Sequence, residues 1–348
     1  MTQAIGYAKW KMALIALVVF CLSSCSEEDD LSDLSDTIIV RHMDADMPAY
    51  IFGNGAEKVF LITLHGGPGG MGLSFRGTAF NSIENTCAVV YFDQRGSGMA
   101  QGSYDEDGIS IDIMAQDVLA LVKVLRLKYG SESRFFLLGH SWGGTLATAT
   151  LLKDQRDFLG WIQVDGTHSP RDLYAKYLSN FERVAAEQIS TGNSIPFWES
   201  VNELVEEVDP EFNRDDISRL NSKAFDAEQE LSGDDLINSP SGGRDDLVFQ
   251  YNLLTFYWNL LNTQSLLDPD IQGILSYTDR LSEITLPTLI LWGEYDMVVP
   301  VAIAKEAYDN IGSSEKRVVI FEKSGHSPMG SAADQFAAEV NLFIDQNK

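Results

Sequence analysis

Basic residues are scarce in this chain of 348 residues: 25 Lys and Arg stand against 51 Asp and Glu, a net charge of −26 at pH 7. Such a charge repels the phosphates of nucleic acids and anionic lipid headgroups, and no local cluster of Lys or Arg offsets it. We therefore exclude nucleic acid as a partner. Apolar residues make up 45% of the chain and charged residues 22%, a composition that also excludes intrinsic disorder and fibrous proteins.

The N-terminus lacks an apolar run that is long enough to span a bilayer. Met12–Leu22 is apolar throughout, but it falls short of the roughly 17–25 residues that a membrane-spanning helix needs. Lys9 and Lys11 precede it and small residues follow it, which is typical of a secretory signal peptide.

The signal ends in Leu-Ser-Ser-Cys at residues 22–25, which resembles the lipobox of bacterial lipoproteins. That resemblance implies that residues 1–24 are removed, that Cys25 is acylated, and that the acidic residues 25–36 form a solvated tether. The residues after Cys25 also resemble a surface-export signal. We expect a protein of the bacterial cell envelope, held by lipid in the outer membrane and exposed at the surface; an ordinary signal peptide that contains a cysteine is the alternative.

Cysteine is the rarest residue type in the mature part of the chain. Cys21 leaves with the signal and Cys25 takes the lipid, so only Cys87 remains and an intramolecular disulfide is excluded. Cys87 opens an apolar run, which predicts a buried small hydrophobic residue.

Strands and helices alternate along most of the chain from residue 37 onward. We predict two initial strands, a series of buried strands and amphipathic helices between them. The strands are Thr37–Val40, Ala49–Phe52, Val59–Leu64, Ala88–Phe92, Phe135–Leu138, Trp161–Val164, Thr288–Trp292 and Arg317–Phe321, and the helices are Ile113–Tyr129, Thr145–Leu152, Val301–Ile311 and Ala332–Ile344. This order predicts an α/β protein whose mostly parallel sheet has helices on both faces.

The alternation stops once. Residues 167–280 contain helical stretches such as Phe197–Val208 and Leu247–Leu261 but no convincing strand. We predict a helical insertion at 167–280 between two parts of one sheet domain, residues 37–166 and 281–348.

The strongest chemical motif is Gly139-His140-Ser141-Trp142-Gly143, which follows a strand and opens a helix. A G-x-S-x-G sequence in that setting is a nucleophile elbow, a tight turn that exposes Ser141 above the sheet. The alternative is a glycine-rich turn with no catalytic role.

A glycine-rich loop, residues 65–70 (HGGPGG), follows another strand. Its backbone N–H groups can approach a negatively charged oxygen, and we expect the N–H groups of Gly67 and Trp142 to form an oxyanion hole. A phosphate-binding loop is excluded because the loop has neither G-x-G-x-x-G spacing nor a Lys-Ser/Thr ending.

A serine nucleophile needs a base and a carboxylate that orients the base. Among five histidines, His326 lies just past the last strand, and Asp296 lies just past the strand before it. Parallel strands end at one edge of the sheet, so Ser141, Asp296 and His326 should converge there, in the chain order of α/β-hydrolases. Asp165 and Glu294 are rival acids.

Together, residues 65–70, Asp93–Gly98 (DQRGSG), the elbow, Gly293–Asp296 and Gly325-His326 resemble the proline iminopeptidase family of α/β-hydrolases. The resemblance covers most of residues 56–165 and 286–330. It implies that residues 167–280 form a cap, whose glutamates hold the free amino terminus of a substrate in these peptidases. We take Glu199 and Trp258 as candidate substrate-binding residues, and we expect Asp93 and Arg95 only to brace their loop.

Three functions remain open. The first is a serine aminopeptidase that releases N-terminal residues from peptides; the second is a capped esterase or amidase with a different acyl substrate. The third is a non-catalytic surface-binding lipoprotein. The chemistry needs neither a metal nor a cofactor, and we expect a small peptide or acyl substrate and membrane contact only through the lipid anchor.

Overall fold

The computed structural model describes residues 30–102, 108–208, 214–239, 251–272 and 275–348. The expected signal peptide and Cys25 lie outside these residues. Within them, no helix is both long and apolar enough to cross a membrane, and no three His, Cys, Asp or Glu side chains are grouped to hold a metal ion.

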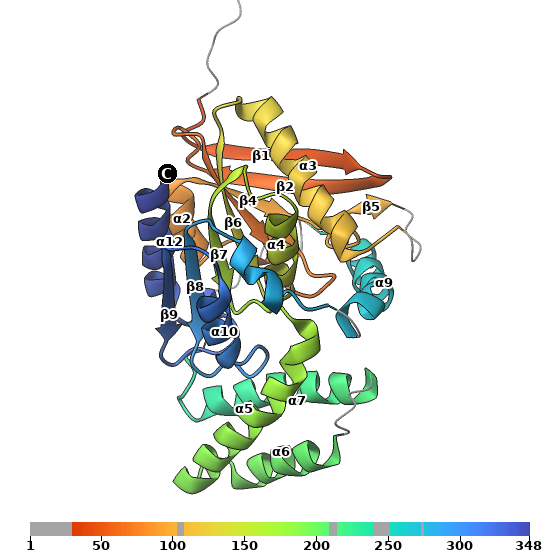
Figure 1. Ribbon diagram of the computed structural model, residues 1–348, viewed down its shortest axis with the longest axis vertical. Coiled ribbons are helices and arrows are strands. Elements are labelled where there is room, and N and C mark those ends of the chain that lie inside the picture. Colours follow the sequence, from red (N-terminus) through yellow and green to blue (C-terminus); the bar gives the residue numbers. More distant parts are fainter. Residues whose placement is uncertain (1–29, 103–107, 209–213, 240–250, 273–274) are drawn as a thin grey trace, which may run out of the picture. The chain divides into compact units, whose positions relative to one another are not determined.

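A mostly parallel sheet forms the framework of the described chain (Figure 1). Its strand order is β1-β2-β4-β3-β6-β7-β8-β9, and β5 pairs with β2 outside this path. The pairs β1–β2, β2–β4 and β2–β5 are antiparallel, whereas all pairs from β4–β3 to β8–β9 are parallel. The strands are β1 (Leu34–His42), β2 (Ala45–Gly53), β3 (Val59–Leu64), β4 (Ala88–Phe92), β5 (Gln101–Gly102), β6 (Arg134–His140), β7 (Phe158–Val164), β8 (Thr288–Gly293) and β9 (Lys316–Phe321).

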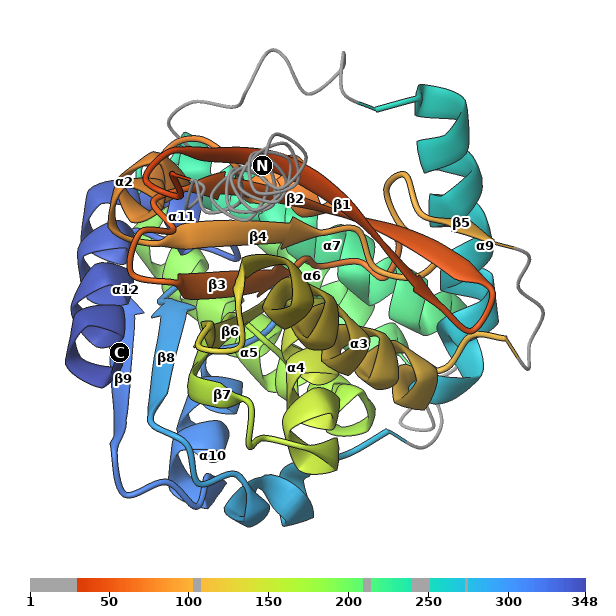
Figure 2. The same cartoon turned by 90° about the horizontal axis from the view of Figure 1, so that it is seen from above.

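Helices cover both faces of the sheet, which explains why β3, β4 and β8 are buried along their whole length (Figure 2). The helices α2 and α12 pack together on one face, and α3, α4 and α10 lie on the other. Their bounds, with those of the short helices, are η1 (Gly72–Phe75), α2 (Ala79–Thr86), α3 (Ile111–Tyr129), α4 (Trp142–Lys153), α10 (Ala302–Asn310), α11 (Pro328–Ser331) and α12 (Ala333–Asn347).

The described part of residues 167–280 is helical and contains no strand. It consists of α5 (Pro170–Thr191), α6 (Ile195–Glu207), α7 (Arg214–Gly233), α9 (Leu253–Gln272) and η2 (Thr278–Glu283), which lie between β7 and β8 in the chain. Part of the expected helix Leu247–Leu261 lies outside the described residues. We refer to these helices as the cap.

The start of the sheet corrects one boundary. The acidic tether was expected to reach residue 36, but β1 begins at Leu34, which lies opposite Gly53 in the ladder with β2. Asp36 is part of the sheet edge: it accepts a 2.7 Å hydrogen bond from the Tyr129 hydroxyl and forms a 2.6 Å ion pair with Lys128. The charge of Asp36 suggested a solvated linker, but Tyr129 and Lys128 pair with its carboxylate and so allow Asp36 to lie in a strand.

Candidate active site

Ser141 lies in the turn between β6 and α4, where its backbone has φ +56°. A left-handed conformation is costly for a residue other than glycine and persists only where its surroundings impose it. Here the surroundings leave no room for side chains: a Cβ at Gly139 would lie 2.3 Å from the Gly143 carbonyl oxygen, and a Cβ at Gly143 would lie 2.0 Å from the Leu64 carbonyl oxygen. The structure therefore contains the strained strand–turn–helix that the G-x-S-x-G motif predicts.

His326 and Asp296 meet in the loops that follow β9 and β8. The Nδ1 of His326 lies 2.9 Å from Oδ2 of Asp296, and both side chains are buried. The other oxygen of Asp296 accepts hydrogen bonds from the Val298 and Val299 N–H groups, at 2.8 and 2.7 Å. The carboxylate is thus held on both sides, and it holds the imidazole so that Nε2 is left for a proton transfer.

The two rival acids take other positions. Glu294 is exposed, and its position does not suit a buried pair with an imidazole. Asp165 is fully buried, but its Oδ1 accepts a 2.9 Å hydrogen bond from the Gly293 N–H, and Asp296 is the residue that contacts His326 Nδ1.

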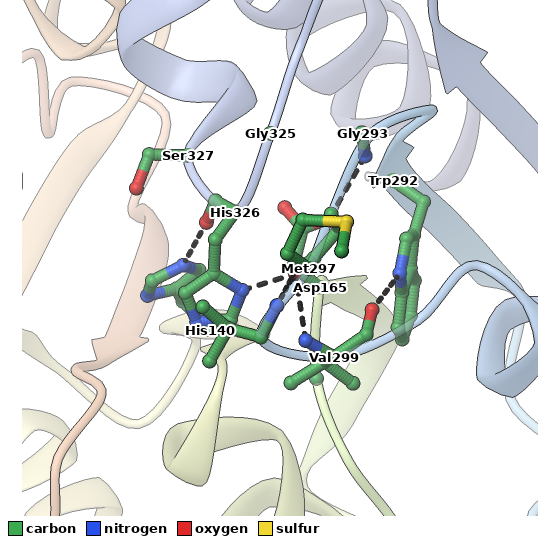
Figure 3. A network of polar contacts seen from close by, with 12 residues as sticks. His140, Asp165, Trp292, Gly293, Met297, Val299, Gly325, His326 and Ser327 are labelled. Atoms are coloured by element: carbon green, nitrogen blue, oxygen red, sulfur yellow. Dashed lines mark hydrogen bonds and ion pairs between the residues drawn. The ribbon is translucent and has the colours of Figure 1, made fainter. Parts of the chain in front are cut away.

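His140 has a role at this site that its position beside the nucleophile did not indicate. Its Nε2 lies 2.7 Å from the carbonyl oxygen of His326, and the centroids of the two rings are 4.8 Å apart (Figure 3). Burial lowers the pKa of His140 to about 3, so the ring is neutral and its Nε2–H donates to that carbonyl. His140 therefore fastens the loop that carries His326 to the elbow.

The glycine loop lies directly against Ser141. A Cβ at Gly66 would lie 3.0 Å from Ser141 Cβ and 3.5 Å from Ser141 Oγ, so the loop backbone borders the hydroxyl. Gly67, with φ +130°, adopts a conformation that glycine favours. Trp142 is the first residue of α4, where an N–H has no acceptor inside the helix and the helix dipole favours negative charge. The loop that carries Gly67 thus borders Ser141, and Trp142 follows Ser141 directly; the oxyanion hole itself stays a prediction.

Glu228 is a site residue that the sequence analysis missed. From α7, its Oε1 accepts hydrogen bonds from the N–H groups of Met297 and His326 at 2.9 and 3.0 Å, and Oε2 lies 3.0 Å from the same His326 nitrogen. Burial raises the pKa of this carboxyl group. A Cβ at Gly325 would lie 2.3 Å from Oε2, so the glycine before His326 permits this close approach. Glu228 was one of many cap carboxylates, and only the packing of α7 distinguishes it.

The two cap residues that the sequence suggested are both exposed. Glu199 lies on α6, which packs against α5, and its carboxylate is open to solvent. An exposed carboxylate does not meet the requirement for a desolvated group that reads a substrate cation, because water screens its charge. Trp258 on α9 is 71% exposed. The neighbouring Asn259 instead anchors α9, since its amide donates to the carbonyl oxygens of Gly98 and Ala100 at 3.1 and 2.9 Å.

Asp93 and Arg95 brace their loop, as predicted. Asp93 accepts hydrogen bonds from the N–H groups of Gly72 and Met99, both at 2.8 Å. The guanidinium of Arg95 forms two 2.8 Å hydrogen bonds with the carboxylate of Asp117. These contacts fasten the loop after β4 to its surroundings.

A cavity of about 1000 Å³ lies between α5, α10 and β9. Its lining includes Asn180, which donates a 3.2 Å hydrogen bond to the carbonyl oxygen of Asp296, but neither Ser141 nor His326. This cavity is therefore separate from the candidate site at Ser141 and His326.

Comparisons with known proteins agree with this fold. The family model of the alpha/beta hydrolase fold matches residues 59–332. A proline iminopeptidase of Saccharolobus solfataricus is 29% identical over 291 residues, covering 82% of this chain and 84% of that protein.

Two crystal structures of low sequence identity share the fold. Proline iminopeptidase from Mycobacterium smegmatis has a TM-score of 0.61 at 16% identity, covering 90% of this chain and 98% of its own. The esterase RhEst1 from Rhodococcus sp. ECU1013 has a TM-score of 0.57 at 17% identity, covering 91% and 100%. The predicted fold class is confirmed, and the chain belongs to the α/β-hydrolase family.

Proposed function

We propose that this hydrolase works through a Ser141–His326–Asp296 triad and an acyl-enzyme intermediate. The observation that carries the proposal is the meeting of His326 Nδ1 and Asp296 Oδ2 at 2.9 Å, on the same edge of the sheet as the strained Ser141 turn. Asp296 holds the imidazole in the tautomer that leaves Nε2 free to accept a proton.

The reaction follows from these positions. The Ser141 hydroxyl attacks the acyl carbon while His326 takes its proton, and the N–H groups of Gly67 and Trp142 stabilise the oxyanion. His326 then returns the proton to the leaving group, which departs and leaves an ester on Ser141. Water, deprotonated by His326, hydrolyses this ester and regenerates the serine hydroxyl.

We further propose that the substrate is a peptide with a free amino terminus and that the enzyme is an aminopeptidase of the proline iminopeptidase type. Glu228 supports this substrate class, because it brings a partly buried carboxylate from the cap against the loops of Asp296 and His326. The described residues place no Lys or Arg against this carboxylate. A substrate ammonium would supply the missing positive charge, in a place where attraction exceeds its value in water.

Covalent labelling tests the triad. A fluorophosphonate should label the wild-type chain and not Ser141→Ala, and an unlabelled but folded wild type would leave the non-catalytic binding protein as the better explanation. Chromogenic substrates then test the substrate class: we expect cleavage of unblocked prolyl or small apolar aminoacyl substrates and rejection of their N-acetyl forms. Equal kcat/KM for the free and acetylated forms would favour the capped esterase or amidase.

We also propose that the mature protein begins at an acylated Cys25 and is anchored to the outer membrane of a bacterial cell envelope. The support is the Leu22–Cys25 pattern after a short apolar run. Multiple acylation is the physical requirement, because a single acyl chain gives only marginal membrane binding.

A further inference from the structure

Asp165 belongs to the same network of polar contacts as His326 (Figure 3), although the partner of His326 Nδ1 is Asp296. Asp165 follows β7, is fully buried, and has φ +42°, a conformation that asparagine and aspartate tolerate better than other side chains. Its N–H donates a 3.0 Å hydrogen bond to the carbonyl oxygen of Leu291, and its Oδ1 accepts from the N–H of Gly293. Asp165 thus ties the end of β7 to the end of β8, three residues before Asp296.

The second oxygen of Asp165 presents a chemical problem. Oδ2 is buried and receives no N–H or O–H hydrogen bond from the described residues. The carboxyl group of Asp165 is also close enough to that of Asp296 for each to influence the pKa of the other. Two ionised carboxylates have no hydrogen to share and repel each other. A single proton between them removes both difficulties, because a protonated carboxyl group donates and an ionised one accepts.

The surrounding charges also require a proton in this group. Asp165 and Asp296 are fully buried, whereas Glu228 is partly buried and accepts the backbone N–H of His326. Within the described residues no Lys or Arg contacts any of these three carboxyl groups. Three negative charges in this group, two of them fully buried, would be strongly unfavourable, since unpaired charges in a protein interior shed or take up protons instead.

The hydrogen bonds decide which carboxyl group keeps the proton. Burial raises the pKa of Asp165 well above its ordinary value, and the charges of Asp296 and Glu228 raise it further. Burial acts on Asp296 as well, but Asp296 accepts two backbone N–H bonds, where Asp165 accepts one. Each such bond favours the ionised form.

We propose that Asp165 is a positioning residue, held as a neutral carboxylic acid whose O–H donates to Asp296 and keeps that carboxylate ionised and aimed at His326. This inference rests on the proposed triad. It makes Asp165 a partner of the triad acid rather than its rival, and it predicts that the site tolerates loss of the Asp165 ionisable group but not loss of its donor.

Two substitutions separate the donor from the charge. Asp165→Asn keeps an oxygen for the Gly293 N–H and an N–H₂ donor for Asp296, so fluorophosphonate labelling of Ser141 should keep the pH midpoint of the wild-type chain. Asp165→Leu removes both functions at similar volume. Asp296 then becomes more basic and raises the pKa of His326. The low-pH midpoint of the labelling rate should therefore move up by about one pH unit, and labelling should slow about tenfold.

Either of two results would overturn the proposal. A downward shift of the acid limb in Asp165→Asn would show that a negative charge had been removed and that Asp165 is ionised. A wild-type profile in Asp165→Leu would show that Asp165 does not act through Asp296.

Infrared spectroscopy provides a readout that does not depend on catalysis. At pH 7 the wild-type chain should show the carbonyl band of a buried protonated carboxyl group, and this band should disappear in Asp165→Asn. Glu228→Gln is measured alongside to identify any band that comes from the Glu228 carboxyl group. If this band is absent, the inference is wrong even when labelling is normal. If the wild-type chain is not labelled but the band is present, the proposed function fails while the shared proton stands.

Discussion

Replacing Glu228 by glutamine is the most informative change to the cap. Glutamine keeps one oxygen that can accept the N–H groups of Met297 and His326, which Glu228 Oε1 already binds at 2.9 and 3.0 Å. The substitution therefore removes the negative charge while the loop contacts remain possible. Any change in activity then reports on charge more than on folding.

The expected loss follows from the charge of a bound ammonium. Two unit charges 4 Å apart attract by about 4 kcal/mol at an effective dielectric constant of 20. Desolvation of both groups offsets part of this, so we expect a net loss of about 1.5–3 kcal/mol, or about tenfold to a hundredfold in kcat/KM, for substrates with a free amino terminus. Any residual cleavage of N-acetylated substrates should not depend on this charge attraction, because these substrates carry no ammonium group.

The same variant has a second signature in its pH profile. The negative charge of Glu228 raises the pKa of His326 against the larger effect of burial, so its removal should lower that pKa and move the acid limb to lower pH. This shift should appear with every substrate, since it belongs to the free enzyme.

Glu199→Gln is the matched control, because it makes the same chemical change on an exposed cap helix. We expect it to leave the ratio of free to acetylated cleavage unchanged. Equal losses on free and acetylated substrates in Glu228→Gln would refute amine recognition by this residue, and a selective loss in Glu199→Gln would show that the sequence-based choice was better.

Three further predictions concern the triad, its pH dependence and the anchor. Ser141→Ala, His326→Ala and Asp296→Asn should each lower kcat by orders of magnitude without unfolding the chain, and a double variant should lose little more than the worst single one, as kinetics and circular dichroism would show. Burial lowers the pKa of His326 to about 4, so the base should stay unprotonated, and kcat/KM should stay high, well below pH 6.5. If kcat/KM instead falls with a midpoint at or above pH 6.5, the buried environment of His326 is contradicted. Cys25→Ser should release the expressed protein from membranes or mislocalise it in a fractionation assay, and an unmodified mature N-terminus elsewhere, found by mass spectrometry, would contradict the anchor.

Several features could be predicted from the sequence because their causes are local. The bounds of β3 and β4 agree with the predicted strands, since a short apolar run rich in β-branched and aromatic residues has few other stable conformations. The elbow was equally readable, because the backbone approaches at Gly139 and Gly143 exclude any side chain. The residues of such a motif are neighbours in the chain, so their spacing is enough to predict the local backbone geometry.

Other features depend on which segments the fold brings together. Asp165, Asp296 and Glu294 were all candidates because each follows a parallel strand, and only the loop geometry after β8 decides that Asp296 reaches His326. Nothing in the sequence around Glu228 distinguishes it from the other carboxylates of the cap, and only the packing of α7 places it against the loops of Asp296 and His326.

The sequence by itself thus determined the α/β class, and it indicated the serine elbow and the edge of the sheet where we propose that the chemistry lies. Hydrophobic periodicity and glycine sterics act over a few residues and can be read along the chain. Only the tertiary structure decided which acid contacts the base and which cap glutamate lies against the loop of the base, and it supports the proton that we propose on Asp165. Burial and the distance between charges set these properties, and both arise from residues as far apart in the chain as Asp165, Glu228 and His326.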